Sequence, residues 1–130
     1  MTPRFLHLDT NCLIEVLLGK NKTTTLLKAR LRAGWSCATS ALAWHEFVCG
    51  PLLVEQKQDV WDLLEGSILP IDYEIAELAA EIFNKSGRRK GSKPDCIIAA
   101  TAIHHKAKLL TWNKEDFKKI EKLGFALELE

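Results

Sequence analysis

Short apolar runs alternate with amphipathic stretches along this chain. The runs at 4–8, 35–39, 67–71, 108–112 and 125–129 have the length and composition of buried strands. Stretches with helical spacing of their apolar residues separate these runs. Strands that are joined through helices pair in parallel and are covered on both faces. We therefore expect an α/β fold, a three-layer α/β/α sandwich around a central parallel sheet.

The helices are predicted from apolar spacing and from the residues that begin and end helices. Asp72 caps the clearest helix, in which one face carries Ile75, Leu78, Ala79, Ile82 and Phe83. The other predicted helices span 10–18, 23–32, 40–49, 51–64, 94–106 and 114–123.

Length and composition agree with a single domain over residues 1–130. The hydrophobic fraction of 47% is enough for a real core. No apolar stretch approaches the roughly 18 residues that span a bilayer, and the N-terminus lacks a secretory signal pattern, so we expect a cytoplasmic protein without a membrane partner. A net charge of +1 excludes a globally basic nucleic-acid binder and leaves room for a local basic patch.

Cysteine and tryptophan residues are interpreted as structural. None of the cysteines forms a C-x-x-C pair, which argues against a zinc ribbon, and we predict reduced, buried thiols at Cys12, Cys37, Cys49 and Cys96. We predict core or interface anchors, in preference to base-stacking platforms, at Trp44, Trp61 and Trp112.

Four acidic residues lie where a parallel sheet would form a site. Asp9, Asp95 and Asp116 fall at the starts of helices near strand ends, and Glu46 lies one turn inside its helix on a largely apolar stripe. Each acid also has an ordinary explanation. Asp9 caps a helix, Asp95 and Asp116 meet a helix dipole in the first turn, and Glu46 is exposed at the margin of its stripe.

Converging carboxylates raise one another's pKa and need a counter-charge. Mg²⁺ or Mn²⁺ supplies that charge and prefers oxygen ligands. One or two such ions activate a water and stabilise the charge that develops on a phosphodiester during in-line displacement. The four acids together therefore predict metal-dependent phosphodiester hydrolysis.

Several segments together resemble PIN-domain proteins, and most of all the VapC-type toxin ribonucleases of toxin–antitoxin pairs. These segments are FLHLDTN (5–11), AWHEF (43–47), PDCIIAATAIHH (94–105) and LLTWNKEDF (109–117). The resemblance implies a PIN-like sandwich and endonucleolytic cleavage of single-stranded or looped RNA. It also implies a homodimer and an antitoxin protein whose tail blocks the site.

By position, the resemblance assigns Asp9, Glu46 and Asp95 to three catalytic, metal-binding acids of the family. The fourth acid falls within TWNKEDF (111–117). The position that is often acidic in the family is Asn113 here, whereas Asp116 retains the acid of the D–F pair. Either Asn113 or Asp116 completes the site, and we take Asp116 as the fourth metal-binding residue.

Substrate-binding residues are predicted on both sides of the acids. The segment KSGRRKGSK (85–93) leads into Asp95 and is either a solvated loop or a phosphate-binding loop. If the segment binds RNA phosphates, the residues that contact them are Arg88, Arg89 and Lys93. Thr10 and Asn11 either hydrogen-bond Asp9, a water or a phosphate, or are ordinary polar residues of a helix start.

Other functions fit the residues less well. A haloacid-dehalogenase-like phosphatase needs D-x-D after the first strand, where this chain has DTN (9–11). A nucleotide-binding module on a Rossmann-like sheet lacks its glycine-rich motif. A PIN-fold RNA-processing nuclease that is not a toxin, and a catalytically weak PIN-fold protein-binding module, are kept as alternatives.

Overall fold

A parallel sheet forms the centre of the computed structural model, which describes residues 4–130. Within that range, five strands lie in the order β3-β2-β1-β4-β5, and every neighbouring pair is parallel. The strands are β1 (Phe5–Leu8), β2 (Ser36–Ser40), β3 (Ile68–Leu69), β4 (Lys108–Leu110) and β5 (Glu128–Leu129). Residues 1–3 of the predicted 1–130 domain lie outside the described residues.

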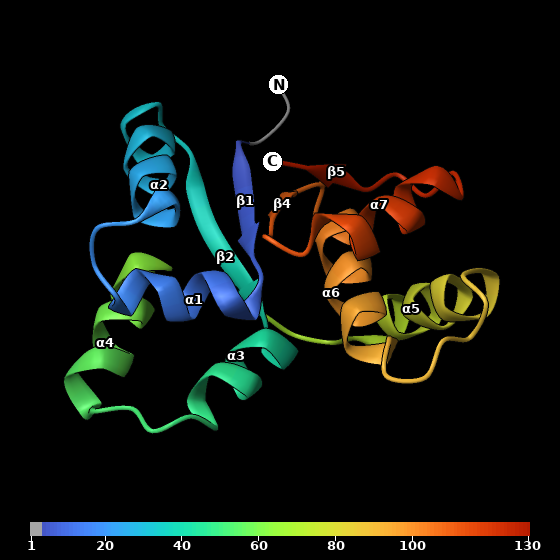
Figure 1. The fold of residues 1–130 in the computed structure, drawn as a ribbon, viewed down its shortest axis with the longest axis horizontal. Helices are drawn as coiled ribbons and strands as arrows, with labels where there is room; N and C mark the ends of the chain where they lie inside the picture. Colours follow the sequence, from blue (N-terminus) through green and yellow to red (C-terminus); the bar gives the residue numbers. More distant parts are fainter. Residues whose placement is uncertain (1–3) are drawn as a thin grey trace.

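Helices cover the sheet on both sides, which confirms the predicted α/β/α sandwich. They are α1 (Thr10–Leu17), α2 (Lys22–Arg32), α3 (Ala41–Val48), α4 (Val54–Leu63), α5 (Tyr73–Lys85), α6 (Lys93–His104) and α7 (Lys114–Lys122). Helices α1, α2 and α4 lie on one side and α5, α6 and α7 on the other, while α3 contacts both α1 and α6 (Figure 1). In the part of the chain that is described, no helix is long and apolar enough to cross a membrane.

Local capping explains where the helices begin. Asp72 caps α5 as predicted, accepting a hydrogen bond from the backbone N–H of Ile75 at 2.9 Å. Helix α4 begins at Val54 instead of Pro51, because Leu53 takes the N-cap position. The backbone N–H of Leu53 donates to the Gln56 side chain at 2.9 Å, which closes the first turn there.

The outer strands are shorter than predicted. β3 covers only Ile68 and Leu69 of the predicted 67–71 run, since Pro70 follows and has no N–H to donate to a neighbouring strand. β5 likewise covers two residues of 125–129. Both are edge strands with one partner each, so fewer hydrogen bonds extend them.

Small side chains allow α6 to lie close to the core. The helix buries Cys96, Ile98 and four small residues, which are Ala99, Ala100, Thr101 and Ala102. It packs extensively against α5. The N-terminal turn of α6 carries Asp95. This turn lies near the carboxyl ends of the central strands β1 and β4, close enough for Asp9 to act on Asp95.

The burial of cysteine and tryptophan differs in part from the prediction. Cys12, Cys37 and Cys96 are buried, but the prediction is wrong for Cys49, which is exposed. The buried face of α3 ends with Phe47, and Cys49 lies two residues further, on another side of the helix axis. Trp61 and Trp112 are 43% and 40% exposed, so neither belongs to the buried core.

We expect one of the four thiols of the native protein to react rapidly with Ellman's reagent. Cys49 is exposed, whereas burial raises the pKa of Cys12 to about 12 and that of Cys37 to about 11, which suppresses their reactive thiolates. All four thiols should react after denaturation. Cys49→Ser should remove the rapid phase, and a rapid phase that persists in this variant would contradict the assignment.

Candidate active site

Asp9 lies where β1 passes into α1, and two threonines hold its carboxylate. Its Oδ1 accepts a hydrogen bond from the backbone N–H of Thr10 at 2.8 Å. Its Oδ2 accepts one from the Thr111 hydroxyl, also at 2.8 Å. Thr111 directly follows β4, and the register that pairs Leu8 with Leu110 brings the two strand ends together. Asp9 is therefore both a helix cap and a side chain held from the neighbouring strand.

Glu46 reaches the same region from α3. Its Oε1 accepts a hydrogen bond from the Thr10 hydroxyl at 2.9 Å. The side chain is exposed, because the buried face of α3 is formed by Ala43 and Phe47. Thr10 contacts both acids, with its backbone N–H bonded to Asp9 and its hydroxyl to Glu46.

Asp95 lies half-buried in the first turn of α6, and its environment opposes ionisation. Burial raises the pKa of this carboxyl from its ordinary value of 3.8 to about 6, and the charges of Asp9, Asp116 and Glu46 act in the same direction. Arg89 partly offsets them. The other three predicted acids therefore all act electrostatically on Asp95.

Asp116 lies in the first turn of α7 and has the opposite environment. A side-chain hydrogen bond from Asn113 to its Oδ2, at 2.9 Å, lowers its pKa first of all, and the cations of Arg89 and Lys119 lower it further. The Arg89 guanidinium lies 3.5 Å from Oδ2. Asn113 also donates its backbone N–H to the Thr111 hydroxyl at 3.1 Å. The structure therefore brings Asn113 and Asp116 together as one unit.

The donor chemistry of this site fits a hard divalent cation. Carboxylate oxygens are the preferred ligands of Mg²⁺ and Mn²⁺, and the charges of three neighbouring acids add to the effect of burial in raising the pKa of Asp95. Within residues 4–130, however, no three Asp, Glu, His or Cys side chains form a group that could hold an ion as they lie. Thr10, Thr111 and Asn113 instead hydrogen-bond the carboxylates individually.

A small cavity opens between Asp95 and Asp116. Its volume is about 40 Å³, which is enough for a water-sized guest. Arg89 and Lys119 also line it, as do Ser86 and Ser92. The cavity therefore lies between the acid with the raised pKa and the acid with the lowered pKa.

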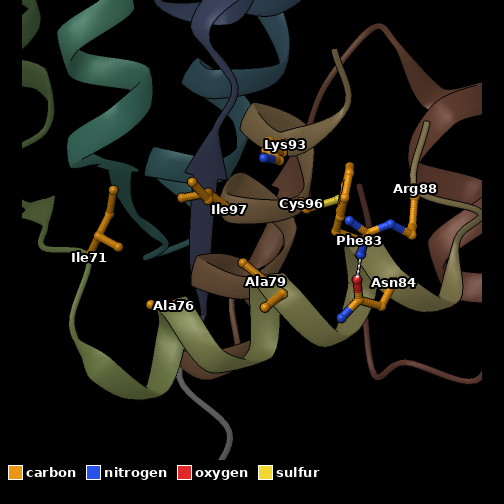
Figure 2. Close-up of a pocket in the computed structure, with 10 residues that line it drawn as sticks. Ile71, Ala76, Ala79, Phe83, Asn84, Arg88, Lys93, Cys96 and Ile97 are labelled. Atoms are coloured by element: carbon orange, nitrogen blue, oxygen red, sulfur yellow. Dashed lines mark hydrogen bonds between the residues drawn. The ribbon is translucent and has the colours of Figure 1, made fainter. Parts of the chain in front are cut away.

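The predicted phosphate-binding cations divide between two places. Arg89 faces the acids, whereas Arg88 and Lys93 hold their charged groups 5.0 and 5.3 Å from the ring centre of Phe83. Arg88 and Lys93 line a separate cavity of about 360 Å³ between α5 and α6, in which Arg88 also donates a hydrogen bond to Asn84 (Figure 2). Of the three cations, only Arg89 contacts a carboxylate of the site.

The remaining residues of the site differ in how well the sequence indicated them. Asn11 is exposed in the first turn of α1, beside Thr10. Thr111, which holds Asp9, was not predicted. The predicted strand 108–112 includes Thr111, whereas β4 ends at Leu110, so Thr111 is the first residue after the strand and its hydroxyl can reach Asp9.

Comparisons with known proteins identify related chains. The PIN domain family model matches residues 6–123. A chain of a toxin–antitoxin complex from Klebsiella pneumoniae is 31% identical, with 86% of this chain and 89% of that chain covered and a TM-score of 0.69. The comparison with curated proteins gave no match.

Two further structures share the fold at lower identity. A chain of VapBC2 from Rickettsia felis, bound to a DNA fragment from its promoter, is 23% identical with a TM-score of 0.71 and 97% of each chain covered. A chain of FitAcB from Neisseria gonorrhoeae is 24% identical with a TM-score of 0.72 and 95% of each chain covered.

With divalent cations removed by EDTA, we expect Asp95→Asn to raise the free energy of unfolding near neutral pH. The pKa of Asp95 is higher in the folded chain than the ordinary 3.8, so ionising it costs stability as pH rises through about 6. The gain in the variant is at most about 3 kcal/mol, and solvent screening of this half-buried group reduces it. Urea denaturation at several pH values measures it, and the gain should vanish below about pH 4.

Asp116→Asn is the matched control with the opposite sign. The pKa of Asp116 is lowered in the folded chain, so its ionised form stabilises the fold. This variant should be less stable than the parent at neutral pH, and the difference should shrink as pH falls through the lowered pKa. A difference between Asp95→Asn and the parent that does not vary with pH would contradict the assigned environment.

Proposed function

This chain belongs to the PIN-domain family, and we propose that it is a metal-dependent endoribonuclease acting as the toxin of a toxin–antitoxin pair. The observation that carries the proposal is the convergence on Asp95 of three other carboxylates, Asp9, Asp116 and Glu46, whose charges add to the larger effect of burial and raise the pKa of Asp95 to about 6. A structural cluster of acids in a small domain gains nothing from such repulsion. A bound divalent cation would offset it.

We propose that Asp9, Glu46, Asp95 and Asp116 hold Mg²⁺ or Mn²⁺. When bound, the ion neutralises these acids, activates a water and stabilises the charge that develops on the phosphodiester. Thr10 and Thr111 orient the carboxylate of Asp9 through hydrogen bonds of 2.8 Å each.

Binding of RNA is assigned to cations and amides around the acids. Arg89 lies beside Asp116 and is placed to contact a phosphate next to the cleaved bond, while Asn113 holds Asp116. Thr10 and Asn11 border Asp9 on the other side. Arg88 and Lys93 add positive charge across the 86–92 loop, where they contribute to attraction of the RNA backbone in a salt-dependent way.

An antitoxin and a second copy of the chain are the proposed protein partners, and the proposed location is the cytoplasm. Support for the antitoxin comes from the 31% identical chain, whose structure is a toxin–antitoxin complex. Like the homodimer, this partner follows from the family resemblance of the whole chain and not from one side chain.

Purified protein should cleave RNA that contains single-stranded loops when Mn²⁺ or Mg²⁺ is present, and EDTA should stop the reaction. Asp95→Asn should lower the cleavage rate by about a thousandfold, since several kcal/mol of charge stabilisation are lost. Gel analysis of labelled RNA measures the rate, and Mn²⁺ titration calorimetry should show weakened binding in the same variant.

Asp59→Asn is the matched control for this experiment. It makes the same chemical change at an exposed acid of α4 and should cleave like the parent. Circular dichroism should show that both variants are folded. Equal cleavage by Asp95→Asn and the parent would show that Asp95 is not a catalytic residue. A parent without any cleavage would favour the protein-binding module.

Induced expression of the parent in bacteria should stop growth, and expression of Asp95→Asn should not. Coexpression of a small reading frame found beside this one should restore growth, because the encoded antitoxin would cover the site. Growth curves and plating measure both effects. A parent that cleaves RNA in vitro and leaves growth unaffected would identify a processing nuclease of the same fold in place of a toxin.

A further inference from the structure

Trp112 is an exposed aromatic residue set between two residues of the acidic site. Thr111, which precedes it, donates its hydroxyl to Asp9, and Asn113, which follows it, donates its side-chain amide to Asp116. The backbone of Trp112 is therefore held at the edge of the sheet where the four acids lie. The residue is 40% exposed, so part of its surface is open to solvent.

Hydrogen bonds fix the orientation of the Trp112 ring. The indole N–H donates to the hydroxyl oxygen of Thr23 at 2.7 Å. Thr23 is fully buried at the start of α2, and its own hydroxyl donates to a carboxylate oxygen of Glu15 on α1 at 2.6 Å. The ring is thus ordered by two hydrogen bonds in series before any ligand arrives. Because an ordered side chain loses little further entropy on binding, this is the arrangement that a contact surface needs.

A cation accompanies the ring. The Lys114 ammonium lies 5.8 Å from the ring centre of Trp112 and is carried by the first residue of α7. Trp61, the other strongly exposed tryptophan, instead packs edge-on against Trp44, with ring centres 5.8 Å apart. The exposed ring of Trp112 and the neighbouring ammonium match a nucleotide, which presents a flat base beside a negative phosphate.

We propose that Trp112 stacks on an unpaired base of the RNA substrate next to the cleaved phosphate, and that Lys114 contacts the adjoining phosphate. This inference rests on the proposed ribonuclease function and adds a residue that selects the substrate. A base inside a duplex already stacks on both faces, so a ring at this position favours nucleotides in loops and single strands. Stacking of this kind tolerates any base, because every base has a π-face.

The binding test uses the Asp95→Asn protein, in which we expect cleavage to be about a thousandfold slower, and a fluorescein-labelled single-stranded RNA of mixed sequence. Adding Trp112→Leu should weaken binding by about 5- to 150-fold, the range of one base–aromatic stack. Trp112→Phe keeps a smaller ring and loses the hydrogen bond to Thr23, so its affinity for RNA should lie between those of the Trp112 and Trp112→Leu proteins. Fluorescence anisotropy measures the dissociation constants, and thermal melting shows whether each variant is folded.

Tyr73→Leu is the matched control. Tyr73 is 76% exposed at the start of α5, where its neighbours Asp72 and Glu74 lie within 4.0 Å of His104 at the far end of α6 from Asp95. Removing this exposed ring should leave RNA binding unchanged.

Duplex RNA of the same sequence should bind the Trp112→Leu and Trp112 proteins with similar affinity.

Abasic substitution separates stacking from a structural role. Removing one base at a time from the RNA should reveal a position where binding to the Trp112 protein weakens by the same factor of about 5 to 150. That position should have no effect in Trp112→Leu, since the ring and the base contribute through the same contact. A merely structural role of Trp112 would make every RNA, intact or abasic, bind more weakly by one factor.

The possible failures are distinguishable. If Trp112→Leu binds RNA as tightly as the Trp112 protein, stacking is refuted while cleavage by the parent still stands as the test of the ribonuclease. If Trp112→Leu weakens binding of an antitoxin peptide and leaves RNA binding unchanged, the ring belongs to a protein interface and the proposal is refuted. If the parent cleaves no RNA, the ribonuclease function itself fails.

Discussion

The parallel pairing of β1 with β4 is the constraint on which the acidic site depends. It places Leu8 opposite Leu110, so the residues that follow these strands emerge side by side. The hydrogen bond from Thr111 to Asp9 and the bond from the Asp9 backbone N–H to the Leu110 carbonyl, at 3.0 Å, both result from this register. A shift by one residue would turn the side chains of β4 to the opposite face and separate the pair.

Two neighbouring acids in this site have opposite electrostatic environments. Asp95 is half-buried near other carboxylates and has a raised pKa, whereas Asp116 is surrounded by donors and cations and has a lowered one. Arg89, in the middle of the loop between α5 and α6, acts on both acids. The site therefore combines several carboxylates with two nearby cations, Arg89 and Lys119, a combination suited to a metal ion and a phosphate together.

Sequence patterns predicted the order of strands and helices, the α/β/α layers and the sheet edge that carries the acids. They were less accurate where a single side chain sets a boundary, as Gln56 does at the start of α4 and Pro70 at the end of β3. The spacing of apolar residues also could not show that Cys49 is exposed, since its exposure depends on where α3 ends. The exposed ring of Trp112 was missed for a related reason, because its neighbours come from α1 and α2.

The sequence by itself determined the properties that depend on near neighbours: helical and strand periodicity, helix caps such as Asp72, and acids at the ends of predicted strands. Only the tertiary structure decided which distant groups meet. Thr111 holds Asp9 from 102 positions away, and Thr23 holds Trp112 from 89 positions away. The adjacent Arg88 and Arg89 also point to different places, one onto Phe83 and the other toward Asp116. The physical reason is that such contacts arise from the packing of whole elements, and no local pattern in the chain records the distance between them.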